Sequence, residues 1–363
     1  MATLDEPFAV GDLQVRNRIA MAPMTRMQSP GGVPGPEVAD YYARRARNGV
    51  GLIFTEGTYV GRPQAAEHEG VPHFHGEQAL AGWQEVARRV REAGGRIIPQ
   101  LWHTGLTRGD LDPPAEGPSG IGLDGAPHGV AMTRQDLDAV IAAFAEGAAH
   151  AERLGFDGVE LHGAHGYLID SFLWERTNRR TDGYGGDPAS RARFAAEIVQ
   201  AVRAAVSPGF PVFFRFSQWK VGHYDARIAE NPDELAALLG PLAEAGVDVF
   251  HASTRRYWLP EFEGSDLNLA GWARKLTGKP SVTVGSVGQA QQFGDGGGLA
   301  EGYTTESSVT GIEELRERLA RDEFDLVAVG RTLLSNPDWA DKALRNDLTD
   351  IAPYDPAVLA TLS

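Results

Sequence analysis

Short apolar segments alternate with longer amphipathic segments along the chain. The short segments cover residues 19–22, 52–55, 97–101, 158–161, 212–216, 249–252, 281–284 and 326–329. Most of them are apolar at consecutive positions rather than at every second position, which is typical of parallel strands covered on both faces. The pattern therefore predicts eight buried strands.

The segments between these strands space their apolar residues as helices do. Residues 78–93 follow this spacing and end in Gly94-Gly95, a typical helix stop. Residues 133–154 begin with Thr133, a favoured N-cap residue. The other predicted helices cover residues 188–206, 232–245 and 312–320.

Repeated strand–helix units in one chain predict an α/β fold, a (β/α)8 TIM barrel. Because no linker divides the sequence, we expect residues 1–363 to form a single domain with an extra N-terminal segment and long loops after several strands. A doubly wound open sheet is the alternative, and a Gly-rich dinucleotide-binding motif after an early strand would favour it. The first strand is instead followed by Pro23, Met24 and Thr25, which form no such motif.

Composition narrows the classes of partner. The 363 residues are 42% hydrophobic and 23% charged, as in ordinary globular proteins, and they include no Cys, which excludes disulfides and iron–sulfur clusters. A net charge of −15 argues against a nucleic-acid partner. No apolar segment approaches the roughly 20 residues of a membrane span, and the N-terminus lacks the pattern of a secretory signal. We therefore expect a cytoplasmic enzyme with a small-molecule substrate.

Polar, titratable or small residues follow the predicted strands. In a TIM barrel the active site lies at the C-terminal ends of the strands, so we expect these residues to form one site. They include Pro23, Met24, Thr25, Gly57, Gln100, Trp102, His162, His165, Tyr167, Arg215, Gly285, Ser286, Gly330 and Arg331.

The last two strand ends suggest a phosphate site. Loops after strands seven and eight often bind phosphate in these barrels. Gly285 and Gly330 would let backbone N–H groups approach an anion, and Arg331 would add a forked cationic donor. Alternatively, both glycines serve tight turns and Arg331 is a surface charge.

His162 and His165 are three positions apart, a spacing that would place both on one face of a helix. A metal site is disfavoured, because no third ligand has a suitable spacing. A second interpretation is a pair of donors that polarise a carbonyl or phenolate oxygen, with Tyr167 as proton donor. A helix N-terminus with satisfied histidines is the structural alternative.

Arg215 and Gln100 are polar residues on apolar strands. A buried guanidinium must face an anion or a partly negative ligand atom, unless a carboxylate such as Glu160 pairs with it. The Gln100 amide offers both a donor and an acceptor, as a ring imide requires. A purely structural role for Gln100 is equally consistent with the sequence.

Several longer motifs resemble one family. They are MAPMTR (21–26), QLWHTG (100–105), HGAHGYL (162–168), RTDGYGG (180–186), VGR (329–331) and SNPDW (335–339). Together they resemble the old yellow enzyme family of FMN-dependent NAD(P)H ene-reductases, nearly from end to end. The order of the motifs, each at a predicted strand end or loop, makes the resemblance specific.

The resemblance implies how FMN would bind. Pro23, Met24, Thr25 and Gly57 would lie along the flavin ring, with the Thr25 hydroxyl near the carbonyl at position 4. Gln100 would hold the pyrimidine edge, and Arg215 would lie beside N1 and the O2 carbonyl. The phosphate would be held by Gly285, Ser286, Gly330 and Arg331.

The resemblance also implies a ping-pong reaction. NAD(P)H would deliver hydride to flavin N5 and leave, and an activated alkene, an α,β-unsaturated carbonyl or nitro compound, would then accept that hydride at its β-carbon. His162 and His165 would bind the substrate oxygen, and Tyr167 would protonate the α-carbon. The substrate pocket would include Met27, Trp102 and Tyr354. We expect Tyr257 and Trp258 to shape this pocket because their segment follows the sixth predicted strand, and packing within surface loops is the alternative for these aromatic residues.

Some segments depart from the family pattern. Thr25 stands where one branch has Cys, and Met27 stands where that branch has Tyr. Residues 217–220 and 255–264 have no counterpart from which a role can be transferred. A non-catalytic FMN- and phenol-binding barrel, another flavin-dependent oxidoreductase and a non-flavin barrel lyase are the alternatives. Both a monomer and a homodimer, and both NADH and NADPH, are compatible with the sequence.

Overall fold

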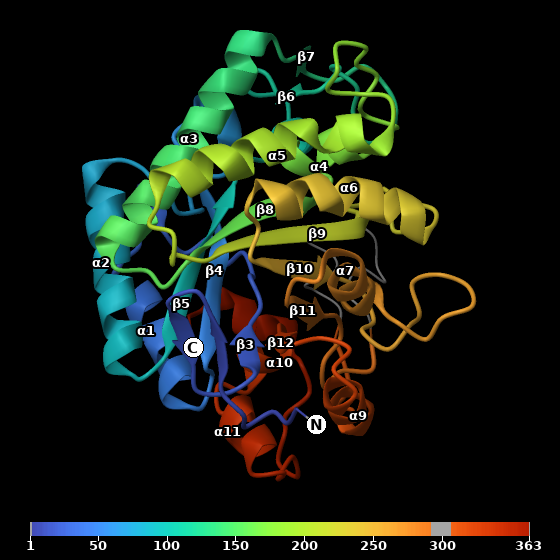
Figure 1. The fold of residues 1–363 in the computed structure, drawn as a ribbon. Helices are drawn as coiled ribbons and strands as arrows, with labels where there is room; N and C mark the ends of the chain where they lie inside the picture. Colours follow the sequence, from blue (N-terminus) through green and yellow to red (C-terminus); the bar gives the residue numbers. More distant parts are fainter. Residues whose placement is uncertain (1, 292–305, 363) are drawn as a thin grey trace.

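Eight parallel strands form a closed barrel in the computed structural model, which describes residues 2–291 and 306–362 (Figure 1). In spatial order the barrel strands are β3 (Ile19–Met21), β4 (Leu52–Tyr59), β5 (Arg96–Trp102), β8 (Val159–His165), β9 (Val212–Lys220), β10 (Val249–Ser253), β11 (Ser281–Val284) and β12 (Leu326–Val329). The first and last strands pair, with Ala328 opposite Ala20, and close the barrel. The predicted TIM barrel and all eight predicted strands are confirmed.

Alternate residues of the strands belong to two separate cores. One apolar cluster contains Phe54, Phe213, Val249 and Val282, which fill the barrel interior. The neighbouring positions on the same strands, such as Phe214, pack against the outer helices. This alternation follows from the two-residue period of a strand, whose side chains point to opposite faces.

The extra N-terminal segment closes the bottom of the barrel. It forms a hairpin of β1 (Phe8–Val10) and β2 (Leu13–Val15), whose apolar residues join the interior cluster. The N–H of Asp12 donates to the carbonyl of Gly209, just before β9 begins. The hairpin therefore covers the N-terminal ends of the strands and leaves the C-terminal ends accessible.

Helices surround the barrel. They are α1 (Pro36–Arg47), α2 (Glu77–Glu92), α3 (Arg134–Leu154), α4 (Leu168–Leu173), α5 (Pro188–Ala205), α6 (Pro232–Ala245), α7 (Leu269–Thr277), α9 (Glu313–Ala320), α10 (Thr332–Ser335) and α11 (Trp339–Leu344). The five predicted helices are confirmed. Thr133 caps α3 in a capping box with Asp136, as its N-cap position requires.

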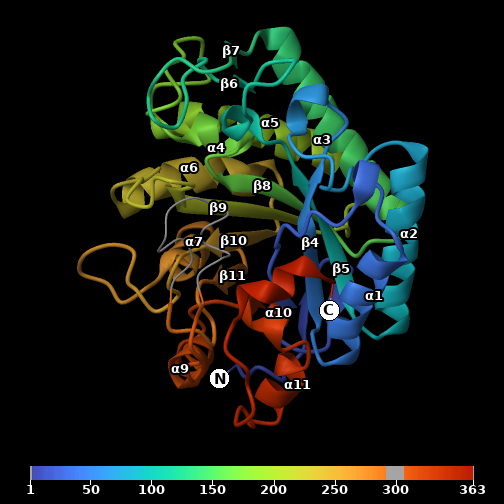
Figure 2. The ribbon, with the colours of Figure 1, turned by 180° about the vertical axis from the view of Figure 1, so that it is seen from behind.

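The first helix of the chain packs against the last two where the barrel closes. Figure 2 shows α10 and α11 beside α1. The N–H of Asp341 in α11 donates to the carbonyl of Asn48 after α1, and Arg45 of α1 donates to the carbonyl of Leu333 in α10 at 3.0 Å. These contacts connect the first and last strand–helix units around the site.

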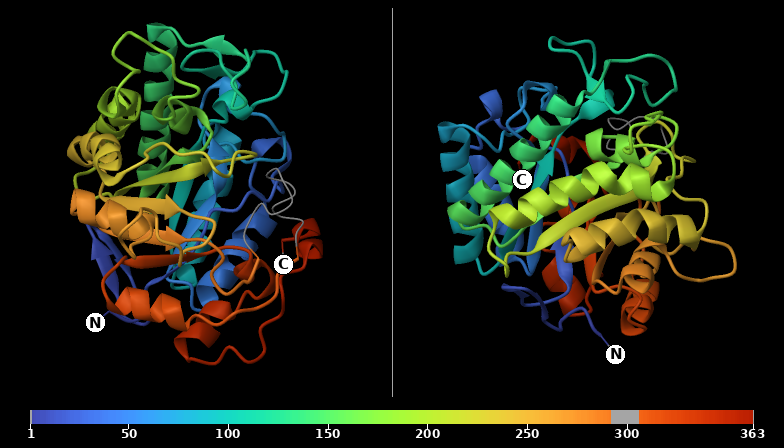
Figure 3. Two further views of the ribbon diagram at one scale, coloured as in Figure 1. Left: turned by 90° about the vertical axis from the view of Figure 1, so that its right-hand side faces the viewer. Right: turned by 45° about the horizontal axis from the view of Figure 1, so that its top comes forward.

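Long loops follow several strands, as predicted. The loop after β5 carries a small sheet of β6 (Glu116–Gly117) and β7 (Val130–Ala131), which stands at the top of both views in Figure 3. Glu116 anchors it through an ion pair with Arg62 and a 2.8 Å contact with His103 Nε2. The loop after β11 includes residues outside the described part of the chain. In the described ranges, no helix has the length and apolar character needed to cross a membrane.

Candidate active site

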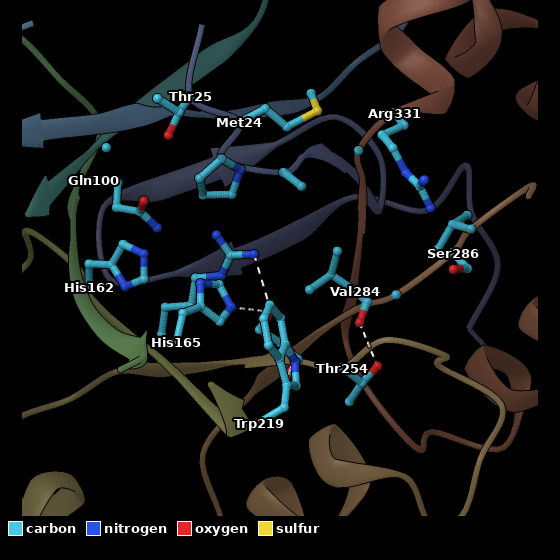
Figure 4. Close-up of a pocket in the computed structure, with 18 of the residues that line it drawn as sticks. Met24, Thr25, Gln100, His162, His165, Trp219, Thr254, Val284, Ser286 and Arg331 are labelled. Atoms are coloured by element: carbon cyan, nitrogen blue, oxygen red, sulfur yellow. Dashed lines mark hydrogen bonds between the residues drawn. The ribbon is translucent and has the colours of Figure 1, made fainter. Parts of the chain in front are cut away.

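A cavity opens at the C-terminal ends of the barrel strands, and its empty space, including the open mouth, is about 870 Å³ (Figure 4). Fourteen residues named from the sequence line it: Pro23, Met24, Thr25, Gly57, Gln100, Trp102, His162, His165, Tyr167, Arg215, Gly285, Ser286, Gly330 and Arg331. The position of the cavity agrees with the general location of active sites in this fold. The structure therefore brings together the expected flavin, phosphate and proton-donor residues.

Four residues expected in the substrate pocket do not line this cavity. Met27 is 44% exposed, and Tyr257 is buried with its ring against Trp258. Tyr354 lies under the guanidinium of Arg331, 5.5 Å from it, at the phosphate end. The sequence placed these residues in loops, whose course is not set by the periodicity of a strand or helix.

A buried hydrogen-bond network orients Gln100. Its amide Nε2 donates to Glu160 Oε1 at 2.8 Å, and Glu160 Oε2 lies 2.6 Å from His251 Nδ1. Burial lowers the pKa of His251, so the neutral ring donates its Nδ1 proton to the carboxylate. With one amide hydrogen committed to Glu160, the carbonyl oxygen and second hydrogen of Gln100 remain for a ligand.

Arg215 reaches the cavity from the inner face of β9. Its Nη2 lies 3.4 Å from the hydroxyl of Ser253, and only 6% of the residue is exposed. Glu160, the carboxylate considered from the sequence as its partner, bonds to Gln100 and His251. Arg215 therefore brings a buried positive charge to the cavity wall.

His162, His165 and Tyr167 form one wall of the cavity. The His162 ring meets that of Tyr167 edge to face with centroids 4.8 Å apart, and it meets the His165 ring at 5.1 Å. Burial, followed by the positive charge of Arg215, holds the pKa of both histidines well below the usual range. Both rings are therefore neutral and can each donate one hydrogen bond.

The two histidines share this wall because β8 is irregular, not because they lie on a helix. Residues three apart on a regular strand point to opposite faces. The pairing of β8 with β9 shifts in register between Gly163 and His165, and His165 has a φ of +68°. This local distortion turns His165 into the cavity beside His162.

A buried ion pair supports the turn after His165. Lys220 Nζ lies 2.9 Å from Asp170 Oδ2, which accepts the N–H of Gly166 at 2.6 Å. Burial raises the pKa of Asp170 to about 6, and the Lys220 charge opposes that rise. Lys220 belongs to the segment 217–220 for which the sequence suggested no role.

Backbone groups dominate the opposite end of the cavity. Gly285 has a φ of +150°, and a Cβ there would lie 2.6 Å from Thr254 Oγ1. Ser286 has a φ of +51°. At Gly330, by contrast, the nearest atoms to an added Cβ would be Met24 Sδ at 3.7 Å and another side chain at 4.0 Å, so the space beside it belongs to the cavity. This end can accept an anion close to the backbone.

The donor set fits FMN. Figure 4 places Gln100, His162 and His165 on one side of the cavity and Ser286 and Arg331 on the other. An amide and a guanidinium suit the pyrimidine edge of a flavin, whereas glycine backbone and Arg331 suit a phosphate. The open space at Gly330 is a cradle that a side chain would fill. In residues 2–291 and 306–362, no group of three His, Asp or Glu is arranged to hold a metal ion.

Sequence reasoning assigned no individual role to Ser253 or Trp219. Both line the cavity, and both contact His165. Ser253 ends strand β10, a position that the rule for TIM-barrel active sites singles out. Trp219 could not be found in this way, because only the tertiary structure brings its ring onto His165.

The barrel and its cavity define a flavin-binding oxidoreductase of the TIM-barrel class. The model of the NADH:flavin oxidoreductase / NADH oxidase family matches residues 3–295, and the chain belongs to this family. It is 34% identical over 349 residues to an NADH oxidase of Thermoanaerobacter brockii, with 92% of this chain and 49% of that protein covered. It is 32% identical to the chanoclavine-I aldehyde reductase fgaOx3 of Penicillium roqueforti, with 98% and 92% covered. The chain thus spans about half of the first relative and nearly all of the second.

Solved structures of related proteins have the same fold. Morphinone reductase in complex with tetrahydroNAD superposes with a TM-score of 0.81 at 27% identity, covering 99% of this chain and 94% of that one. An old yellow enzyme homologue from Zymomonas mobilis has the same fold, with a TM-score of 0.78 at 24% identity and coverage of 98% and 96%. The expected family, an oxidoreductase with FMN as cofactor and NAD(P)H as co-substrate, is confirmed.

Proposed function

We propose that this chain is an ene-reductase, which uses NAD(P)H to reduce the C=C bond of α,β-unsaturated carbonyl or nitro compounds. One observation carries the proposal: His162, His165 and Tyr167 form a single wall of the cavity that also contains the groups expected to bind FMN. A neutral donor pair and a proton donor at one place match the needs of conjugate reduction.

His162 supplies a donor for the substrate oxygen. Its Nδ1 lies 3.4 Å from the backbone N–H of Ala164 and accepts from it, which leaves the proton on Nε2. Because burial keeps the ring neutral by lowering its pKa, it stabilises developing oxygen charge by hydrogen bonding without transferring a proton. Withdrawal of charge onto that oxygen makes the β-carbon of the substrate electrophilic.

Tyr167 supplies the proton for the α-carbon. Tyr167 is 5% exposed, and its ring meets that of Trp102 edge to face with centroids 4.8 Å apart. Packing against Trp102 and His162 fixes the ring at the cavity wall, so the hydroxyl is positioned before the substrate arrives. A phenol is a weak acid, but a carbanion-like α-carbon is a strong base.

FMN, when bound, supplies the hydride that the β-carbon accepts. Gln100 and Arg215 would hold its pyrimidine edge, Thr25 would lie beside the ring, and Gly285 and Arg331 would serve its phosphate. Arg215 would place positive charge beside the bound flavin and would stabilise its reduced form. Trp102 closes the substrate space from β5.

Separate half-reactions test the proposal. FMN-loaded protein is reduced anaerobically with NADH or NADPH, and then mixed with cyclohexenone or with saturated cyclohexanone while the flavin absorbance is followed. We expect rapid re-oxidation by the enone only. Re-oxidation by oxygen but not by the enone would favour another flavin-dependent oxidoreductase, and failure of both nucleotides to reduce the flavin would favour a non-catalytic binder.

A further inference from the structure

Ser253 lies between the groups expected to serve the flavin and the substrate. Its hydroxyl oxygen is 2.8 Å from His165 Nε2 and 3.4 Å from Arg215 Nη2. Figure 4 shows a dashed line that runs from the His165 ring to a point beside Trp219. The serine is 3% exposed, so water does not compete freely for its hydroxyl.

The chemistry of the three groups gives this network a direction. A guanidinium can only donate, so the Ser253 oxygen accepts from Arg215. The hydroxyl keeps one proton of its own, and within the described residues the other partner of this oxygen is His165 Nε2. Donation of that proton to Nε2 satisfies both groups, and it requires that Nε2 be the unprotonated ring nitrogen.

His165 has little freedom to turn away from Ser253. The indole of Trp219 stacks on its ring with centroids 4.2 Å apart and planes at 26°, and the indole N–H donates to the Ser253 carbonyl at 3.0 Å. The backbone N–H of His165 donates to Ser217 Oγ at 3.0 Å. Ser253 and Trp219 therefore hold the ring by its edge and by its face.

We propose that Ser253 is a positioning residue that holds His165 in the tautomer with its proton on Nδ1. His165 then offers Nδ1–H to the substrate oxygen, whereas His162 offers Nε2–H. The substrate part of this inference rests on the proposed ene-reductase function, but the tautomer of the ring does not.

Nitrogen NMR tests the tautomer directly. The FMN-loaded protein is labelled with ¹⁵N in its 10 histidines, and His165 is assigned from its absence in His165→Gln. We expect Nδ1 to be protonated in the parent and in Ser253→Thr, which keeps the hydroxyl, and Ser253→Ala to gain Nε2–H. A parent ring protonated on Nε2, or an unchanged tautomer in Ser253→Ala, would overturn the proposal.

Phenol affinity tests the consequence for the ligand. Ser253→Ala should bind a simple phenol roughly tenfold more weakly, and Ser253→Thr should restore most of the affinity, since one hydrogen bond is at stake. The FMN dissociation constant should stay within about twofold of the parent value. If FMN binding weakens instead while phenol affinity is unchanged, Ser253 serves Arg215 rather than His165 and the proposal fails.

The NMR and phenol-binding experiments distinguish the positioning role of Ser253 from the proposed ene-reductase function. A parent with Nδ1 protonated but no affinity for phenol would keep the positioning role of Ser253 and remove the ene-reductase assignment. A parent that binds phenol but carries Nε2–H would do the reverse. If Ser253→Ala does not fold, the tautomers of the parent and of Ser253→Thr still decide the question.

Discussion

The two ends of the cavity are built in different ways. Near β5, β8, β9 and β10, side chains form the site, and other buried side chains hold them: Glu160 holds Gln100, and Ser253 and Trp219 hold His165. Near β11 and β12, the backbone around Gly285 forms much of the site in conformations with positive φ. At the end formed by side chains, a single substitution can alter the chemistry of the site. At the end formed by the backbone, the conformation of the chain determines whether the cofactor fits.

Removal of the Tyr167 hydroxyl should have the largest effect. Tyr167→Phe should slow flavin re-oxidation by an enone by about 10²–10⁴-fold, the usual contribution of a positioned general acid. Reduction by NAD(P)H should be unchanged, because it needs no proton from this group. Rapid-mixing absorbance measurements resolve the two steps.

Tyr184→Phe provides a matched control. The Tyr184 hydroxyl bonds to Glu197 of α5, and Tyr184 does not line the cavity. Its loss should alter neither half-reaction. Equal slowing of both half-reactions in Tyr167→Phe would contradict the assigned role and weaken the contrast between the two ends.

Two glycine variants should distinguish backbone strain from occupied space. Gly285→Ala would place a Cβ 2.7 Å from the Thr254 carbonyl at a φ of +150°, and it should lower both the stability of the apoprotein and the affinity for FMN, the latter by about 10–100-fold. Gly330→Ala should leave the stability unchanged and weaken FMN binding alone, because its Cβ would enter the cavity. Denaturant unfolding measures the stability, and quenching of flavin fluorescence measures the FMN affinity. If Gly285→Ala changes neither quantity, the backbone around Gly285 does not form the cofactor site as described.

Loss of one histidine donor should have a smaller effect. His162→Ala should weaken phenol binding by about tenfold, the value of one hydrogen bond to an anionic oxygen, while FMN stays bound. His150→Ala on the outer surface of α3 is the control and should change neither affinity. Unchanged phenol affinity in His162→Ala would remove this residue from the ligand site.

Glu56 should give the smallest effect, a pH dependence of stability. It is buried and accepts the N–H groups of Arg26 at 2.8 Å and Met27 at 3.2 Å, which holds the turn that carries Thr25. Burial raises its pKa from 4.5 to about 7, so the folded protein binds this proton more tightly than the unfolded chain does. This contribution is present at low pH and is lost as the pH rises from about 4.5 through about 7.

Thermal unfolding at pH 5 and pH 8 measures the contribution. Glu56→Gln keeps the size and an acceptor oxygen but carries no charge. Its Tm should therefore fall less between pH 5 and pH 8 than the Tm of the parent, with a difference of up to about 4 °C. A parallel decrease in both proteins would show that Glu56 does not titrate in this range.

The sequence predicted the barrel well because buried parallel strands have a simple pattern. It cut β4 and β9 short, since polar residues continue both strands, to Tyr59 and Lys220, where they reach the cavity. It missed α1 and α7, whose apolar faces consist largely of small or aromatic residues. The polar residues that made these strand ends hard to predict thus lie at the end of the barrel where the site forms.

The candidate site could be predicted only where it depends on strand ends. Gln100 and Arg215 follow from their positions on apolar strands, and Gly285 follows from its place after β11. The contact of Trp219 with His165 depends on tertiary packing and on the irregularity of β8, which no local pattern encodes. The position of the loop residue Tyr257 could not be predicted for the same reason: its ring packs against Trp258, and it does not line this cavity.

Titration of the FMN-loaded protein with a simple phenol tests the central claim most directly. If His162 and His165 form an oxygen-binding wall over the flavin, the visible spectrum should gain a broad long-wavelength band as the phenolate stacks on the ring. A yellow protein that gains no such band would contradict the assignment of this wall. A protein that takes up no FMN would contradict the account of the whole cavity.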